Sequence, residues 1–282
     1  MQPRSVWGLL ALLGIGAVMV LPGVAMAMPS VAGGHLSLSS KVSPPIYSQP
    51  GQYLSYNWAG YTTFDQANGS VTHVWGTWTE PAVTCPAHGI TYAAFWVGID
   101  GFSTDAVEQD GSLAYCQAGT AHYLAWWEMF PTNAIQVIPT MTVSPGDHMM
   151  GSVVYHPKQY DFTMTVTDMS TGTMFSVTAA QAPAYAMNPL ENSAECIIER
   201  PATIQNGVVT LLHLADFGSV TFSSCGATVN HVSSGVGNFA PAAILYMISL
   251  KSTATHLIYL ASPGGPVNLL RWSFTTQWQK AE

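Results

Sequence analysis

The sequence has few charged residues, and basic residues are the scarcest of them. Only 8% of its 282 residues are Asp, Glu, Lys or Arg, against roughly 25% in an ordinary soluble protein. Seven Lys and Arg against fifteen Asp and Glu give a formal net charge of −8 at pH 7. A nucleic-acid-binding protein needs a basic face to neutralise phosphates, so we expect no nucleic-acid partner. The 48% hydrophobic content also excludes a charge-rich disordered chain.

The scarcity of charge suits an acidic medium. Near pH 2 most carboxylates are protonated, and the nine His join the seven Lys and Arg as cations, which gives a charge of about +16. Few basic residues limit the self-repulsion that drives acid unfolding. A membrane-associated chain or a Ser/Thr-rich secreted chain would have a similar composition, so both alternatives stay open.

Charged residues are also missing from the stretch that follows Arg4. Arg4 is followed by an uncharged stretch with an apolar centre from Trp7 to Val24, and then by the small-residue pattern Ala25-Met26-Ala27. This pattern predicts a signal peptide over residues 1–27, removed after Ala27. An uncleaved membrane anchor is the alternative, since the run is long enough to span a bilayer. We expect the remainder to be secreted, to act in an acidic extracellular environment, and to have no membrane contact once the signal is removed.

The sequence lacks the common metal and nucleophile motifs. It has no Cys-x-x-Cys, no Gly-x-Ser-x-Gly and no His-Glu-x-x-His, which argues against a zinc ribbon, a serine hydrolase elbow and a zinc-protease helix. We therefore expect neither a metal ion nor a cofactor.

Four cysteines remain, and an even number in an exported chain indicates two disulfides. They are Cys85, Cys116, Cys196 and Cys225. Four cysteines allow three pairings, of which their order favours Cys85–Cys116 and Cys196–Cys225. Each bond would close a loop of about 30 residues and stabilise the fold by roughly 3–4 kcal/mol.

No segment of the mature chain shows a capped helical pattern. Residues 28–50 are rich in Ser and Pro and are predicted to be a linker or a short propeptide. Beyond them, short β-branched and aromatic segments alternate with turn residues, which predicts a single domain over residues 51–282. The expected strands are Val71–Thr79, Tyr92–Ile99, Tyr123–Phe130, Gln136–Val143, His148–His156, Asp161–Asp168, Thr173–Ala179, Glu195–Glu199, Ser219–Ser223, Ala242–Leu250, His256–Leu260 and Trp272–Trp278. This spacing predicts an all-β fold, an antiparallel β-sandwich or jelly roll.

Two of the few acidic residues have unusual settings. Glu128 lies within Trp126-Trp127-Glu128-Met129-Phe130, and Glu199 ends Glu195-Cys196-Ile197-Ile198-Glu199. Strand alternation places each on one face with apolar neighbours. Burial among such neighbours raises the pKa of a carboxyl group, which makes both residues candidates for a functional site. An edge strand whose Glu points to water is the alternative for each.

A series of short blocks then gives a resemblance to a known family. The blocks are Asn57-Trp58-Ala59-Gly60, Trp96-Val97-Gly98-Ile99-Asp100-Gly101, Glu108-Gln109-Asp110-Gly111, Ala125-Trp126-Trp127-Glu128, Ser144-Pro145-Gly146-Asp147, Glu195-Cys196-Ile197-Ile198-Glu199 and Phe217-Gly218-Ser219-Val220. In this order and spacing, from about Asn57 to Leu260, the chain resembles the glutamic peptidases, the eqolisin family of acid endopeptidases.

The resemblance implies a concanavalin-like β-sandwich with a catalytic Gln–Glu pair in a concave cleft. The family's glutamine corresponds to Gln109 and its glutamate to Glu199. Family positions that line or support the cleft correspond to Trp58, Trp96, Asp100 and Glu128. Cys196 and the Arg200-Pro201 pair stand where fungal members carry other residues, which bears on subsite preference and pH optimum.

The residue types suit peptide hydrolysis. A Glu199 carboxylate can take a proton from water and later give it to the leaving nitrogen, an effect of roughly 10²–10⁴ in rate. The Gln109 amide can donate a hydrogen bond to the developing oxyanion at any pH, worth about 10²–10³. Unperturbed Glu titrates near 4.3, so such a base works in acid. We therefore expect polypeptide substrates, activity insensitive to pepstatin, and a monomer.

Two other functions compete with this one. A jelly-roll glycoside hydrolase could pair Glu128 with Glu199 across a sugar-binding groove. A non-catalytic carbohydrate-binding or adhesion module could use exposed Trp and Tyr for stacking, and it would tolerate Glu199→Gln.

Overall fold

The computed structural model describes residues 35–43, 52–185, 189–206, 208–265 and 273–282. The predicted signal peptide lies outside the described residues, and the predicted linker is described only from residue 35 to residue 43. Among the residues described, no helix has both the length and the apolar character needed to cross a bilayer.

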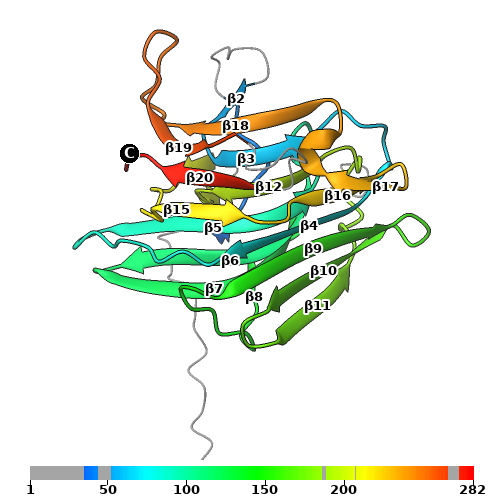
Figure 1. Cartoon of the computed structure of the whole chain (residues 1–282), viewed down its shortest axis with the longest axis horizontal. Coiled ribbons are helices and arrows are strands. Elements are labelled where there is room, and N and C mark those ends of the chain that lie inside the picture. The colour runs from blue at the N-terminus through cyan, green and yellow to red at the C-terminus, as the bar shows by residue number, and fades with distance from the viewer. Residues whose placement is uncertain (1–34, 44–51, 186–188, 207, 266–272) are drawn as a thin grey trace, which may run out of the picture.

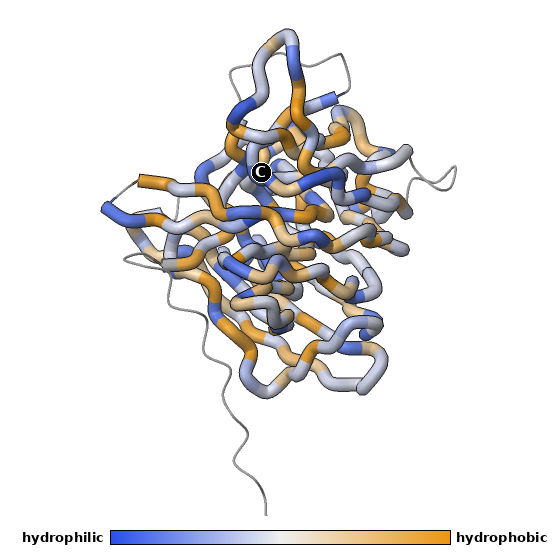
Figure 2. The backbone as a smooth tube through the Cα atoms, turned by 90° about the vertical axis from the view of Figure 1, so that its left-hand side faces the viewer, coloured by the Kyte–Doolittle hydropathy of each residue, from blue (hydrophilic) through white to orange (hydrophobic). Residues whose placement is uncertain are grey.

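Alternating β-branched, aromatic and polar residues form the strands of the sheets, so that hydropathy changes over short distances along the chain (Figure 2). The single helical element of the described residues is a 3-10 turn, Val236–Asn238. The strands are β1 His35–Ser37, β2 Gln52–Ser55, β3 Trp58–Thr63, β4 Val71–Thr79, β5 Ile90–Ile99, β6 Val107–Gln117, β7 Thr120–Phe130, β8 Gln136–Val137, β9 His148–His156, β10 Asp161–Asp168, β11 Thr173–Ala179, β12 Ala194–Glu199, β13 Ala202–Gln205, β14 Val208–Leu211, β15 Ser219–Phe222, β16 Gly226–Val229, β17 Val232–Gly235, β18 Ala242–Ile248, β19 Tyr259–Pro263 and β20 Phe274–Trp278.

Most of the strands form two stacked, mainly antiparallel layers (Figure 1). One layer runs β7–β6–β5–β12–β3–β18. The other runs β11–β10–β9–β4 and continues into β15 and β16. Strands β19 and β20 connect β18 to β15 at one end. This is the predicted all-β sandwich.

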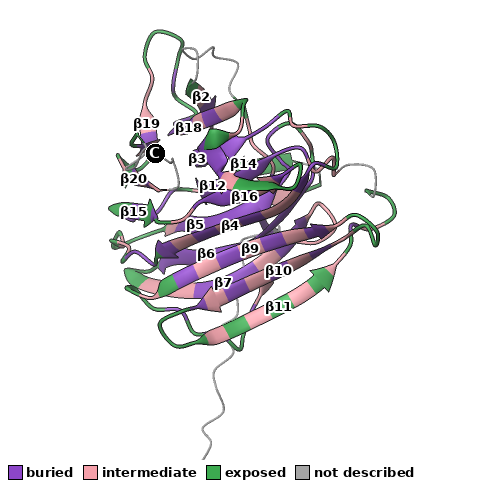
Figure 3. Cartoon of the chain, turned by 45° about the vertical axis from the view of Figure 1, so that its right-hand side comes forward, coloured by how far each residue is buried: buried purple, intermediate pink, exposed green. Residues whose placement is uncertain are grey.

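The central strands are buried on both faces. In β5, Phe95 and Val97 belong to the apolar core between the two layers, whereas Ala94 and Trp96 belong to a second apolar cluster on the opposite face. The edge strand β11 instead alternates between partly buried and exposed residues (Figure 3). The face of β5 that carries Ala94 and Trp96 is therefore covered by apolar side chains. One of them is Leu38, from the N-terminal segment.

The strand predictions are confirmed where alternation is regular. Four expected strands, Val71–Thr79, His148–His156, Asp161–Asp168 and Thr173–Ala179, have the predicted bounds.

Two other strand predictions are wrong in extent. The expected strand Gln136–Val143 shortens to Gln136–Val137, because Pro139 has no N–H to donate and the amide of Met141 turns back to the carbonyl of Ile138. The strand expected at His256–Leu260 begins only at Tyr259, after a turn in which Thr253 and His256 bond to each other.

Both disulfides pair as their order predicted. Cys85–Cys116 closes a sequence separation of 31 residues, and Cys196–Cys225 closes one of 29. The second bond joins β12, the strand that carries Glu199, to the residue directly before β16, so it links the two layers.

Candidate active site

Five neighbouring strands present the predicted residues on one face of a layer. Gln109 lies opposite Glu128 across the β6–β7 ladder, and Glu199 lies opposite Trp58 across the β12–β3 ladder. Trp96 lies on β5, the strand between β6 and β12. Because side chains alternate along a strand, these registers place all five side chains on the same face.

A glycine makes room for the tryptophan on this face. A Cβ at Gly98 would lie 2.7 Å from Cζ3 of Trp96 and 3.3 Å from Cβ of Gln109. The Trp96 ring therefore leans over the glycine toward Gln109, and any larger residue at position 98 would displace one of the two. Trp58 packs edge-on against Trp96, with ring centroids 5.0 Å apart.

The chain's own N-terminal segment crosses this face. Strand β1 pairs with β13, and the residues that follow β1 pass over the polar side chains. Gln109 Nε2 donates to the carbonyl oxygen of Leu38 at 3.0 Å, and the N–H of Ser39 donates to Glu199 Oε1 at 3.2 Å. The predicted pair thus binds the two polar groups of a single peptide bond.

Glu128 orients the glutamine and holds the same segment. Its Oε2 accepts from Gln109 Nε2 at 3.3 Å and from the N–H of Leu38 at 3.0 Å. Its Oε1 accepts from the hydroxyl of Ser37 at 2.5 Å. The bond from Gln109 keeps the NH₂ end of that amide directed at the Leu38 carbonyl.

Asn57 is a residue to which the sequence analysis gave no role. Its Nδ2 donates to Glu199 Oε1 at 3.0 Å and to the carbonyl of Ser40 at 3.2 Å. Its Oδ1 accepts from the N–H of Val42 at 2.8 Å. An Asn directly before a buried Trp-Ala-Gly strand is a signal that could have marked it, because a buried amide needs partners.

The carboxyl groups of the site favour their neutral forms. Glu128 and Glu199 are fully buried. Burial raises the pKa of Glu128 to about 8, against the lowering effect of its bonds to Ser37 and Leu38. Burial also raises the pKa of Glu199 well above its ordinary value, and the nearby Glu128 adds to this rise, whereas the bond from Asn57 lowers it.

Asp100 supports the backbone next to the site and forms no hydrogen bond with Gln109 or Glu199 among the described residues. Its carboxylate accepts from the backbone N–H groups of Leu190, Glu191 and Asn192, and it adopts a φ of 70° just after β5. It holds the loop that enters β12. Burial raises the pKa of Asp100 to about 6, against the lowering effect of these bonds.

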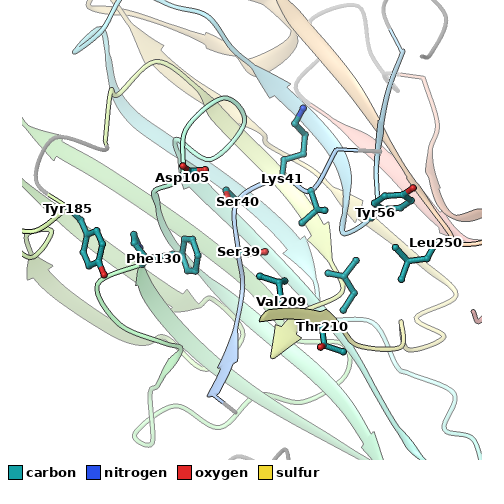
Figure 4. Close-up of a pocket in the computed structure, with 13 residues that line it drawn as sticks. Ser39, Ser40, Lys41, Tyr56, Asp105, Phe130, Tyr185, Val209, Thr210 and Leu250 are labelled. Atoms are coloured by element: carbon teal, nitrogen blue, oxygen red, sulfur yellow. The ribbon is translucent and has the colours of Figure 1, made fainter. Parts of the chain in front are cut away.

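A groove of about 900 Å³ runs along the segment. Figure 4 shows Ser39 and Ser40 between Phe130 and Tyr185 on one side and Tyr56 and Leu250 on the other. Glu128 and Glu199, which lie on the buried side of the segment, accept hydrogen bonds from its backbone N–H groups. Fold and site together define a β-sandwich protein whose cleft holds an extended segment of its own chain.

Comparison with known proteins gives the family. The model of the Peptidase A4 family matches residues 56–259, and the chain belongs to this family. Aspergillopepsin-2 of Aspergillus niger is 30% identical over 193 residues, which are 62% of this chain and 64% of that protein. The match thus spans less than two thirds of the length of this relative.

Solved structures share the fold. Scytalido-glutamic peptidase, in a complex with a peptide-based transition state analog, superposes with a TM-score of 0.64 at 22% identity, covering 79% of this chain and 98% of that one. Aspergilloglutamic peptidase from Aspergillus niger gives a TM-score of 0.52 at 26% identity, covering 67% and 99%. The predicted family resemblance and the sandwich fold are both confirmed.

Proposed function

We propose that this chain is a secreted acid endopeptidase in which Glu199 and Gln109 hydrolyse a peptide bond by direct attack of water. The observation that carries the proposal is that Gln109 and Glu199 bind the carbonyl and the N–H of one peptide bond, at 3.0 and 3.2 Å. The family membership supports the reaction class.

Each group has a defined task in this reaction. Because burial raises the pKa of Glu199, the base is its ionised fraction, which takes a proton from the attacking water and passes it to the departing nitrogen. Gln109 Nε2 donates to the oxygen that becomes negative as the carbonyl carbon turns tetrahedral. Asn57 holds the glutamate, Glu128 holds the glutamine, and Trp58 donates its Nε1–H to the carbonyl oxygen of Ser39 at 3.1 Å.

The test compares wild type with Glu199→Gln on an unfolded protein substrate from pH 2 to pH 7, with pepstatin present. We expect cleavage in acid by wild type and a loss of about 10²–10⁴ in rate for the variant. Glu80→Gln is the matched control, since Glu80 is also buried and bonds Trp78 and Ser112. Ser112 lies on the face of β6 opposite to Gln109, so this control should keep its activity.

Two results would refute the proposal. One is a Glu199→Gln variant that cleaves as fast as wild type. The other is folded wild type that cleaves no protein at any pH.

A further inference from the structure

The groups of the proposed active site are engaged by the chain's own backbone. Residues 36–39 are almost fully buried, with Leu36 the most accessible of them at 7%. The contacts with this segment are mostly to its main chain: the carbonyl oxygens of Leu38 and Ser39 accept from Gln109 and Trp58. Main-chain contacts of this kind would bind any extended peptide.

The segment is held on both sides of the Leu38–Ser39 bond. On the amino side, β1 adds as an antiparallel strand to β13, with Leu36 opposite Thr203. On the carboxyl side, the N–H of Lys41 donates to the carbonyl of Gly101 at 3.0 Å, and Asn57 bonds the main chain on either side of Lys41. The Leu38–Ser39 peptide bond is thereby held against Gln109 and Glu199. Holding reacting groups in position in this way lowers the entropic part of a reaction barrier.

Each of the two side chains keeps one oxygen without a partner among the described residues. These atoms are Glu199 Oε2 and Gln109 Oε1, and both are buried. Buried acceptors without partners are uncommon. Since the other end of each side chain is bound to the Leu38–Ser39 peptide, these two oxygens are the acceptors that the site offers to an attacking water.

From this geometry we infer that the Leu38–Ser39 peptide bond is a self-cleavage site of this chain, which removes the segment ending at Leu38 from its own cleft. The inference rests on the proposed function and names its first substrate. Water oxygen bonds to the carbonyl carbon of Leu38 while its proton passes to the Glu199 carboxylate. The C–N bond then breaks, and the same proton passes to the nitrogen of Ser39. The products are a carboxyl group on Leu38 and an α-amino group on Ser39.

The bound segment also defines a side-chain preference. Leu38 is fully buried and lies in the same apolar cluster as Trp58, Trp96 and Trp126. Ser39, on the other side of the bond, makes one long contact through its hydroxyl, accepting from Asn57 Nδ2 at 3.5 Å. The site therefore takes a medium-sized aliphatic residue on the carbonyl side of the cleaved bond and a small residue on the amino side.

Cleavage would also release the segment. Once the bond is cut, the segment ending at Leu38 is held only by its noncovalent contacts, those of β1 with β13 and those of Ser37 and Leu38 with Glu128 and Gln109. The product with a free carboxyl end then leaves the cleft, and Gln109 and Glu128 become accessible to other peptides.

The experiment uses the full chain with a C-terminal tag, purified at neutral pH and then shifted to acid. Intact mass and N-terminal sequencing follow the chain, and digestion of an unfolded protein is followed in the same sample. We expect a product that begins at Ser39, formed at a rate independent of chain concentration, and digestion that starts after a matching lag.

Substitutions at the bond itself provide a matched pair. Ser39→Pro removes the N–H that donates a hydrogen bond to Glu199. This variant should slow self-cleavage at least about 100-fold. Ser39→Ala keeps that N–H and should be processed like wild type. Glu199→Gln should remain unprocessed.

Three results would overturn the inference. A product that begins at another residue would do so, as would processing of Glu199→Gln at the same bond, which would assign the cut to another protease. A chain that stays intact at Leu38–Ser39 would also overturn it. Digestion of the unfolded protein by such an intact chain would leave the proposed function standing.

Discussion

At the scale of single residues, the site depends on supporting groups as much as on the proposed catalytic pair. Each member of the pair is held by a hydrogen bond to a polar side chain. Gln109 donates to Glu128, and Glu199 accepts from Asn57. A primary amide can turn over with little change in shape, so Gln109 presents its NH₂ group to a substrate only while an acceptor holds that group. Glu128 is therefore a positioning residue.

Substitutions of Glu128 should show whether activity depends on its hydrogen-bonding shape or on its negative charge. Because burial raises its pKa to about 8, Glu128 is neutral at acidic pH and Gln is a close mimic of it. We expect Glu128→Gln to keep kcat within about threefold of wild type below pH 5. Glu128→Leu leaves Gln109 without its acceptor and should lower kcat at least about tenfold, roughly 1.4 kcal/mol in the barrier.

Steady-state kinetics between pH 2 and pH 5 check this prediction, with thermal unfolding as the control for folding. Equal loss in Glu128→Gln and Glu128→Leu would show that the carboxylate charge is needed, in contradiction to the burial argument.

At the scale of the strands, close contact between β5 and β6 sets the position of Gln109. Gly111 lies on β6 opposite Trp96, two residues beyond Gln109. A Cβ at this glycine would lie 2.1 Å from the carbonyl oxygen of Phe95 and 2.8 Å from Cα of Trp96. Both neighbours are backbone atoms of a buried strand, so the ladder itself would have to move.

We therefore expect Gly111→Ala to weaken both stability and activity. Overpacking of a well-packed core costs about 1–3 kcal/mol, and the displaced strand carries Gln109 with it. Thermal unfolding and kcat measure the two effects. Gly265→Ala is the control, because a Cβ there meets no atom within 4 Å and both properties should stay at the wild-type level. Wild-type stability and kcat in Gly111→Ala would contradict the proposed close contact.

At the scale of the whole molecule, the protein buries carboxyl groups and makes little use of ion pairs. Burial raises the pKa of Glu80 and of Glu191 to about 7, and it raises those of Glu108, Asp110 and Glu195 well above their ordinary values. The described residues hold a single ion pair, Arg200 with Glu282. Protonation of carboxylates in acid therefore removes few favourable ion pairs.

The direction of the pH effect follows from proton linkage. An acidic group whose pKa is higher in the folded state holds its proton there after the unfolded chain has lost it, so stability falls as pH rises between the two values. For the buried carboxyl groups this stability is fully present below about pH 4 and is lost as pH rises from there through about 6 to 8. His73, whose pKa is lowered by burial, contributes in the opposite direction.

We predict that the melting temperature falls by on the order of 10 °C between pH 4 and pH 8, since each kcal/mol shifts it by about 2–4 °C in a domain of this size. Glu80→Gln removes one titrating group and should reduce this dependence by on the order of 1–3 kcal/mol. Calorimetric or optical melts of the two proteins across the pH range give the comparison. A melting temperature that rises toward pH 8 would show that the carboxyl groups are charged in the native state.

Alternation of residue types within the sequence determined much of the fold. Strands such as His148–His156 and Asp161–Asp168 follow from period-two patterning, and the turn at Ser170-Thr171-Gly172 between Asp168 and Thr173 gives the hairpin of β10 with β11. The order of the cysteines gave the disulfide pairing. The conspicuous settings of Glu128 and Glu199 also follow from strand alternation alone, and the structure places both on the same face.

Tertiary structure alone decided how β6 is placed. The stretch Glu108-Gln109-Asp110-Gly111 is polar and contains a glycine, which is not a strand pattern. It lies in an eleven-residue strand because β5 and β7 pair with it on both sides. Hydrogen bonds such as that from Gln181 to Glu108 satisfy the polar side chains in this buried position.

Tertiary structure also placed the N-terminal segment in the cleft. The Ser and Pro content of residues 28–50 predicted a linker or a short propeptide, without a partner for it. The contacts that hold Ser37 and Ser39 connect residues 91 and 160 positions apart in the sequence. Local patterning carries no information on such pairs, because they form only once the separate strands have assembled into one sheet. The sequence therefore specifies the groups that we propose for the chemistry, and the folded chain determines which peptide bond lies between them.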